Sequence, residues 1–142
     1  MGTRALTFVY DGEKPIVNLY RQYDGYPTGH GAELAEFLNG FKIVNGIGAE
    51  KTRIANGMGC LAAQVVAHFK DSVGGFYIHS VDATECGQDF EYHVYQKDKE
   101  LRVRITDRGC NMFGLTMSDT NDSIFDGSVA EFVMFCSEPQ AA

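Results

Sequence analysis

The sequence predicts an α+β domain in which helices pack on one face of an antiparallel sheet of about five strands. Short segments in which polar and apolar residues alternate indicate half-buried strands, and three segments with apolar residues three and four positions apart indicate amphipathic helices. The length of 142 residues fits a single domain, and a hydrophobic content of 44% is sufficient for a core. In chain order we expect ββααβββα, forming one domain over residues 1–137 followed by a frayed tail over residues 138–142.

The first two predicted strands form a β-hairpin. Residues 4–11 alternate, with Leu6, Phe8 and Tyr10 on one face. The Asp-Gly pair at positions 11 and 12 is a strong signal for a tight turn, and residues 16–22 then run back along the first strand.

Three segments have the periodicity of a helix. The first ends at Asn39-Gly40, where glycine favours termination, and the third begins at a capping box formed by Ser128 and Glu131. The apolar stripes of the three helices consist of Leu34, Phe37, Leu38 and Phe41; of Met58, Leu61, Ala62, Val65 and Phe69; and of Val129, Phe132, Val133 and Cys136.

Three further alternating segments predict an antiparallel meander with one apolar and one polar face. They cover residues 76–81, 90–95 and 101–106, and the pattern-poor residues 107–124 predict a long loop or a short edge strand. The polar face of this sheet carries Tyr77, His79, Glu91, His93, Tyr95, Arg102 and Arg104. We interpret this face as solvated or as a contact surface.

Composition argues against several classes of function. The net charge of −7 disfavours nucleic-acid binding, which needs a basic footprint. No apolar run reaches the roughly 20 residues of a membrane span, and the first residues have no signal-peptide core. The four cysteines form no CxxC pair, which leaves a zinc ribbon and a redox motif without support. We therefore expect a soluble, cytoplasmic domain without a cofactor.

The loop at residues 23–31 has the densest turn chemistry in the chain and permits two interpretations. Its glycines and proline are typical of a structured connection between the hairpin and the first helix. Alternatively it is a ligand-binding loop ahead of a helix N-terminus, where free N–H groups favour an anion. The binding residues would then be Tyr23, Asp24, Tyr26, Thr28 and His30.

Cys60 is the candidate nucleophile. It lies where the second helix begins, a position that lowers the pKa of a thiol, and His79 or His93 could serve as its base. This order is similar in outline to papain-like cysteine hydrolases, although their local signature around the cysteine is missing. The alternative is a small buried apolar residue on a packed helix. His79 and His93 could also share a metal ion with Glu91 if their strands pair, but exposed histidines on a sheet usually have no such role.

The glycine-punctuated residues 44–59 offer a candidate anion site at Lys51, Arg53 and Asn56. The Gly-Lys-Ser/Thr ending of a P-loop and the G-x-G-x-x-G spacing are both missing. The glycines therefore also fit a simpler function in turns and close packing.

Three stretches of the chain resemble a group of small uncharacterised proteins of bacteriophages and environmental viral sequences. They are VYDGE…IVNLYRQYDGYPTGHGAELAEFL between residues 9 and 38, NGMGCLAAQVVAHFK at residues 56–70 and FEYHVY at residues 90–95. The resemblance covers about the first two-thirds of the chain. It implies a viral or bacterial origin and a host-cytoplasmic setting, and it transfers no activity and no catalytic residue.

Taken together, these observations predict a non-enzymatic binding or accessory protein whose partner the sequence does not identify. Tyr, His and Arg on one sheet face fit a protein interface, so we expect a homodimer through that face or through an edge strand. The alternative is a small cysteine-dependent hydrolase that uses Cys60 with one strand histidine.

Overall fold

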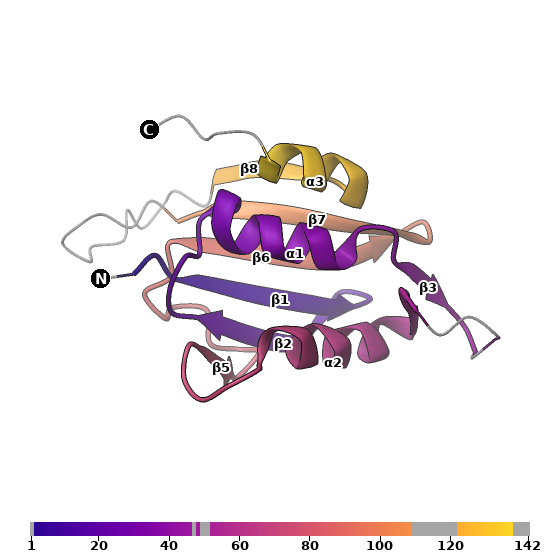
Figure 1. The fold of residues 1–142 in the computed structure, drawn as a ribbon, viewed down its shortest axis with the longest axis horizontal. Helices are drawn as coiled ribbons and strands as arrows, with labels where there is room; N and C mark the ends of the chain where they lie inside the picture. The colour runs from indigo at the N-terminus through magenta and orange to yellow at the C-terminus, as the bar shows by residue number, and fades with distance from the viewer. Residues whose placement is uncertain (1, 47, 49–51, 109–121, 138–142) are drawn as a thin grey trace.

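The computed structural model describes residues 2–46, 48, 52–108 and 122–137 and confirms the predicted α+β class. A six-stranded mixed sheet has the strand order β5-β2-β1-β6-β7-β8, and the helices lie on one of its faces (Figure 1). The strands of this sheet are β1 Ala5–Asp11, β2 Lys14–Arg21, β5 Phe76–His79, β6 Phe90–Lys97, β7 Glu100–Asp107 and β8 Asp122–Ser128. The helices are α1 Ala32–Leu38, α2 Gly57–Phe69 and α3 Val129–Ser137, and a single π-helical turn, η1 Pro27–Gly31, leads into α1.

The predicted hairpin is confirmed. Strands β1 and β2 pair antiparallel from Ala5↔Arg21 to Asp11↔Lys14, and Gly12 takes a φ of 64° in the turn. Glycine adopts this left-handed conformation without the steric cost that a side chain would impose.

The predicted meander is correct for β6 and β7 but wrong for β5. Strand β5 lies at the edge of the sheet and pairs with β2, whereas β6 pairs in parallel with β1 and antiparallel with β7. Residues 80–89 are long enough to carry the chain from β5 past β2 and β1, so proximity in sequence does not impose pairing here. Strand β8 pairs with β7 as the other edge strand, which confirms the edge-strand alternative for residues 122–124, while residues 109–121 lie outside the described residues.

A second, small sheet was not predicted. Strands β3 Lys42–Val44 and β4 Ile54–Asn56 pair in parallel beside the end of α1. Each has only three residues, too short for the alternation that identifies a strand in sequence.

The hydrophobic core lies between the sheet and the helices. Buried residues of α1, α2 and α3 pack against Ala5, Val9, Tyr92, Val94 and other residues on the inward face of the strands. The capping box is formed as predicted, because Ser128 N donates to Glu131 Oε1 at 2.9 Å and Glu131 N donates to Ser128 Oγ at 3.2 Å.

Close packing around η1 depends on Gly31. A Cβ atom at this position would lie 2.8 Å from Cys136 Sγ and 3.3 Å from the ring of Tyr92. The turn can therefore approach α3 and β6 only because residue 31 has no side chain.

The edge of the sheet at β5 is partly protected. Lys70 Nζ donates to the carbonyl oxygen of Phe76 at 2.8 Å, and it lies 5.4 Å from the centre of the Tyr77 ring. A lysine that covers an edge carbonyl is a common way to prevent strand addition.

Within the described residues, no helix has the length and apolar character needed to cross a bilayer.

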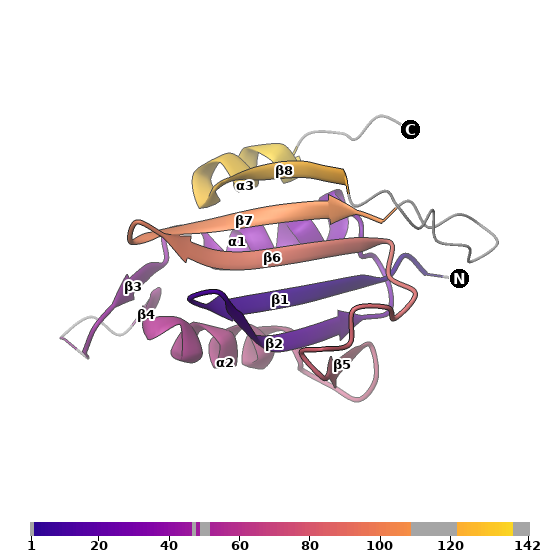
Figure 2. The same cartoon turned by 180° about the vertical axis from the view of Figure 1, so that it is seen from behind.

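The opposite side of the six-stranded sheet, which we call the open face, is not covered by any helix of the described residues (Figure 2). It carries the polar side chains of β6 and β7 together with Leu6, Phe8 and Tyr10 of β1. Residues 80–89 cross one end of this face, where Asn18 Nδ2 donates to the carbonyl oxygens of Ser80 and Ala83, both at 2.9 Å.

Candidate functional site

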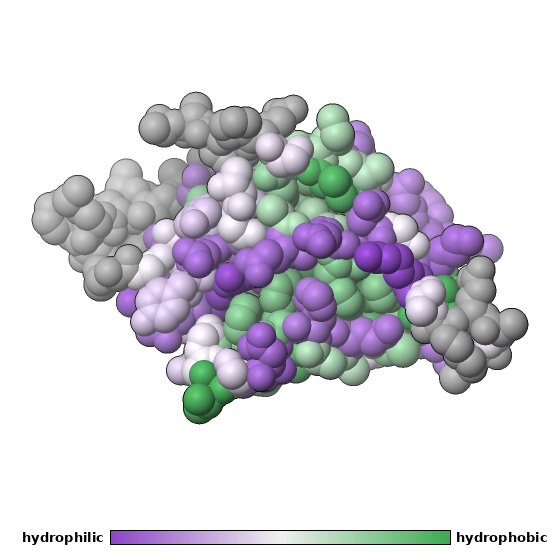
Figure 3. All heavy atoms as spheres, in the orientation of Figure 1, coloured by the Kyte–Doolittle hydropathy of each residue, from purple (hydrophilic) through white to green (hydrophobic). Residues whose placement is uncertain are grey.

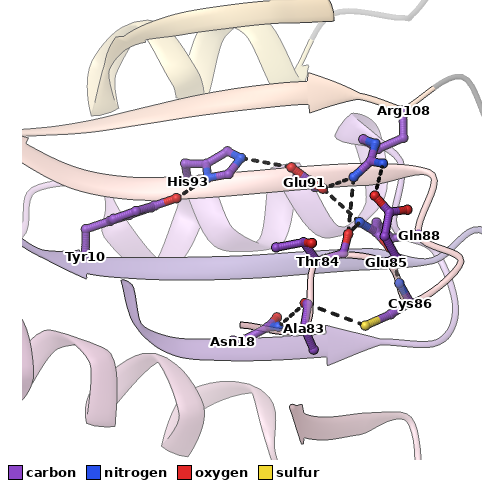
Figure 4. Close-up of polar contacts among 10 residues, drawn as sticks. All are labelled: Tyr10, Asn18, Ala83, Thr84, Glu85, Cys86, Gln88, Glu91, His93 and Arg108. Carbon is purple, nitrogen blue, oxygen red and sulfur yellow. Dashed lines mark hydrogen bonds and ion pairs between the residues drawn. The ribbon is translucent and has the colours of Figure 1, made fainter. Parts of the chain in front are cut away.

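Four polar side chains form a continuous chain of hydrogen bonds on the open face (Figure 4). Tyr10 Oη lies 2.7 Å from His93 Nδ1, and His93 Nε2 lies 3.2 Å from Glu91 Oε1. Arg108 then donates from its NH1 group to Glu91 Oε2 at 2.5 Å. The parallel pairing of β1 with β6 produces this arrangement, because Phe8 lies opposite His93 and Tyr10 projects from the same face.

The electrostatics of Glu91 determine where the protons lie. Burial by itself would raise the pKa of Glu91, but hydrogen bonds from His93, Gln88 and Arg108 lower it to about 2. Glu91 is therefore a carboxylate at neutral pH and accepts a hydrogen bond from Nε2–H of His93. In neutral His93 the other nitrogen, Nδ1, then accepts the hydroxyl proton of Tyr10.

The imidazole ring is held firmly. His93 is 7% exposed, and the Phe8 ring stacks on it with a centroid distance of 5.3 Å and an interplanar angle of 8°. Stacking on one face and a hydrogen bond at each nitrogen leave the ring little freedom to rotate.

Residues 80–89 close one side of the site. Arg108, which is 6% exposed, donates to Glu85 Oε1 at 2.7 Å and to the carbonyl oxygen of Thr84 at 3.3 Å. Gln88 joins the same cluster, with hydrogen bonds to Glu91 and to Thr84. The cluster therefore attaches this connection to the sheet.

Two hollows meet at Tyr10 and His93. The first, of about 270 Å³, lies beneath residues 80–89 and extends to Arg108, and the second, of about 400 Å³, runs along the strands toward Arg104. The first is lined by Phe8, Tyr10, Pro15, Val81, Thr84, Glu85, Glu91, His93 and Arg108, and the second by Tyr10, Gly12, Glu13, His93, Tyr95, Lys97, Arg104 and Asp126. Burial raises the pKa of Tyr10, and the positive charge of Arg104 acts in the opposite direction.

Arg104 differs from the neighbouring arginines on the open face. It lies opposite His93 in the β6–β7 register, and its exposed side chain has no hydrogen bond or ion pair with any described residue. Arg102 is paired with Glu100 at 2.8 Å, and Arg108 is paired with both Glu85 and Glu91. Arg104 is therefore available to an anionic group in the second hollow.

The larger hollow on the helix side, of about 560 Å³, is less suited to binding. It lies between α1 and α2, where hydrophobic residues are visible between hydrophilic ones (Figure 3). Its polar groups already contribute to the fold, because Glu33 forms an ion pair with Arg21 and the Phe37 ring stacks on His68.

The loop at residues 23–31 has a structural function at its centre. His30 is fully buried, and burial lowers its pKa to about 3. Its Nε2 atom is 2.7 Å from Thr7 Oγ1, and its Nδ1 atom is 3.2 Å from the NH1 group of Arg21. Tyr92 Oη also donates to the carbonyl oxygen of Gly25 at 2.7 Å. Of the five residues predicted for a ligand, Tyr23, Asp24, Tyr26 and Thr28 are exposed and His30 points into the core.

The structure does not bring Cys60 near either of the two strand histidines, His79 and His93. Cys60 is exposed on α2, on the helix side of the sheet, and its thiol donates to Gln64 Oε1. His93 lies on the open face, and His79 lies there too, with its Nδ1 3.9 Å from Cys86 Sγ. The two histidines are also separated by β2 and β1, about 14 Å at the usual strand spacing. Among the described residues, no three His, Cys, Asp or Glu side chains are placed to share a metal ion.

The predicted anion site is divided between two structural functions. Arg53 donates from NH1 to the carbonyl oxygens of Glu36, Phe37 and Asn39, and so caps the C-terminal end of α1. Asn56 accepts a hydrogen bond from Gly46 N at 2.8 Å, and Lys51 lies outside the described residues. This region and the loop at residues 23–31 are at opposite ends of α1 (Figure 1).

Sequence reasoning identified His93 and the polar face of β6 but missed Tyr10 and Arg108 as their partners. Tyr10 was placed on the correct face of its strand, yet nothing local indicates that β1 pairs with β6. Arg108 follows β7 in the segment that has no periodic pattern.

No family model, curated protein or solved structure gives a significant match to this chain. The geometry of the open face is therefore the only basis on which a function can be proposed.

Proposed function

We propose that this chain is a binding protein that takes a small polar ligand onto the open face, in the two hollows that meet at Tyr10 and His93. The observation that supports the proposal is the hydrogen-bonded chain from Tyr10 to Arg108, whose donors and acceptors are already fixed. Preorganised polar groups in a hollow reduce the entropic cost of binding.

The chemistry of the walls indicates how the ligand would be recognised. Tyr10 Oη uses its proton toward His93, so its oxygen accepts a hydrogen bond from the ligand. Arg104 offers guanidinium donors that no described residue occupies, and Phe8 provides apolar surface beneath the first hollow. These features favour a ligand that has both a hydroxyl or amine donor and an anionic group, the donor directed at Tyr10 and the anionic group at Arg104.

A thermal-shift screen tests this proposal. The panel consists of nucleotides, inorganic phosphate, sugars, carboxylic acids and amino acids, each measured with the wild-type protein and with Tyr10→Phe and Arg104→Gln variants. A ligand that binds only the folded state raises the midpoint of unfolding by mass action. We expect at least one class to raise the wild-type midpoint, with a smaller rise in both variants.

Tyr77→Phe is the matched control. Tyr77 is also on the open face and half exposed, but it stacks on Tyr20 at the β5 edge and lines neither hollow. If Tyr77→Phe reduced the ligand-induced rise in midpoint as much as Tyr10→Phe does, or if Tyr10→Phe kept the full rise, the ligand would bind outside the two hollows. A panel without any rise would count against a small-molecule site.

A homodimer through the open face remains a prediction. Such a dimer would cover both hollows, so sedimentation velocity of the unliganded protein tests it directly. The cysteine-dependent hydrolase has less support, because Cys60 and the two strand histidines lie on opposite sides of the sheet.

A further inference from the structure

We propose that Tyr10 is a reactive residue, and that His93 removes its hydroxyl proton as Oη attacks an electrophilic acyl or sulfonyl centre of a molecule bound in the two hollows. This inference rests on the proposed binding site and adds a chemical step to it. Glu91 is then a positioning residue, which holds the imidazole and stabilises its protonated form.

The order of the three groups supports this proposal. An activated nucleophile needs a base within hydrogen-bond reach and a third group that orients the base. Tyr10 Oη is 2.7 Å from His93 Nδ1, and Glu91 Oε1 is 3.2 Å from Nε2 on the far side of the ring. The sequence Tyr–His–Glu thus reproduces the roles of nucleophile, base and orienting carboxylate on residues of β1 and β6.

The burial of the base and the exposure of the nucleophile also fit this step. His93 and Glu91 are 7% and 8% exposed, whereas Tyr10 is partly exposed and lines both hollows. A ligand can therefore reach the phenol oxygen while water has little access to the imidazole. Arg104 lines the second hollow together with Tyr10 and can stabilise negative charge that develops on the attacked group.

The reaction step is balanced within these groups and the ligand. A bond forms between Tyr10 Oη and the electrophilic carbon or sulfur, and the bond to the leaving group breaks with its electron pair going to that group. The phenol proton moves to Nδ1 of His93, and the resulting imidazolium remains hydrogen-bonded to the Glu91 carboxylate.

Within the part of the chain that the structure describes, no other tyrosine hydroxyl forms a hydrogen bond with a histidine. Tyr92 Oη is buried against the carbonyl oxygen of Gly25, and Tyr95 Oη contacts the carboxylate of Asp126. Tyr23 is the most exposed tyrosine, at 55%, yet no histidine accepts its proton. A reaction governed by exposure alone would thus favour Tyr23, and a reaction assisted by a base would favour Tyr10.

An arylsulfonyl fluoride tests the difference, because fluoride leaves when a phenol oxygen attacks the sulfur. We would incubate the full chain with 4-(2-aminoethyl)benzenesulfonyl fluoride at neutral pH and measure the labelling rate of each tyrosine by peptide mapping in a mass spectrometer. We expect Tyr10 to react before Tyr23. His93→Gln should slow the labelling of Tyr10 by about 100-fold, within the range of general-base assistance, without changing the rate at Tyr23.

Two further variants make the result specific. Glu91→Gln should slow labelling of Tyr10 while leaving Tyr23 unchanged, and Tyr77→Phe, at a tyrosine of the open face that lines neither hollow, should leave the Tyr10 rate unchanged. Circular dichroism of each variant checks whether the fold is retained. Because His93→Gln leaves the Glu91–Arg108 pair in place, it tests the base even if Glu91→Gln fails to fold.

Equal rates at Tyr10 and Tyr23, or a Tyr10 rate that His93→Gln does not change, would overturn the proposal. The two proposals fail separately. A ligand that stabilises the protein through Tyr10 and Arg104, without base-assisted labelling, would leave the binding function in place and remove the reactive tyrosine.

Discussion

Replacing Glu91 with glutamine tests the energetic role of the buried ion pair between Glu91 and Arg108. It keeps the size of the side chain and removes the charge that Arg108 and His93 both face. The side chains of Glu91 and Arg108 are 11% and 8% exposed, so little water is available to replace the lost interaction. We expect the substitution to lower the free energy of unfolding by about 3 kcal/mol at neutral pH.

The structure provides this magnitude in two ways. Hydrogen bonds in the folded state lower the pKa of Glu91 from 4.5 to about 2, and at about 1.4 kcal/mol per pKa unit this corresponds to about 3 kcal/mol. Independently, removing one partner of a buried ion pair typically costs about 3–5 kcal/mol. The lower end applies here, because Arg108 keeps its contact with Glu85.

The pH dependence has a definite sign. The pKa of Glu91 is lower in the folded than in the unfolded state, so its contribution is fully present above about pH 4.5 and is lost as the pH falls through about 2. The difference in stability between wild type and Glu91→Gln should therefore shrink over this range.

Urea unfolding at a series of pH values between about 7 and 2, followed by circular dichroism, measures both effects. Glu100→Gln is the control, since Glu100 also pairs with an arginine but its side chain is 54% exposed, and we expect little change there. Glu91→Gln could have the same free energy of unfolding as Glu100→Gln at neutral pH, or its loss of stability relative to the wild type could stay constant down to about pH 2. Either result would show that the buried Glu91–Arg108 pair does not stabilise the fold as we infer.

Four other substitutions test the fold. Gly31→Ala should destabilise the protein by about 1–3 kcal/mol, because the added methyl group would contact Cys136. Gly59→Ala, whose methyl group would meet no atom within 4 Å, should stabilise the protein by up to about 1 kcal/mol because alanine has the higher helix propensity in α2. Thermal unfolding of both variants separates the packing effect at Gly31 from the helix-propensity effect at Gly59. Ser128→Ala should cost about 1 kcal/mol in urea unfolding, and no change would mean that the cap is not formed in solution. The pKa of His30 is about 3 in the folded state, so the side chain stays neutral there while it becomes protonated in the unfolded chain below about pH 6.5. The free energy of unfolding of the wild type should therefore fall by up to about 5 kcal/mol between about pH 6.5 and 3. His30→Gln should not show this fall when its unfolding is followed across the same pH range.

Much of the local structure could be predicted from the sequence because it depends on neighbouring residues. The hairpin turn at Gly12, the three amphipathic helices and the cap at Ser128 are all encoded within a few positions of each other. The division of β6 into an apolar and a polar face is similarly local, since side chains alternate along any strand, and it placed His93 on the correct side of the sheet.

The partners of His93 depend on long-range pairing instead. Tyr10 contacts His93 only because β1 pairs with β6 in parallel. This pairing depends on the packing of the whole sheet and is not encoded in either strand alone. The same holds for His79, which the meander placed next to His93 and the structure places three strands away.

The sequence alone therefore determined the fold class, most of the elements and the residues on each face, because periodicity and capping act over a few residues. The tertiary structure decided which faces meet, that His30 lies in the core, that Arg53 caps a helix, and that Tyr10, His93, Glu91 and Arg108 form one hydrogen-bonded chain. These contacts join residues as far as 83 positions apart, and the free energy that selects them comes from burying the whole core at once.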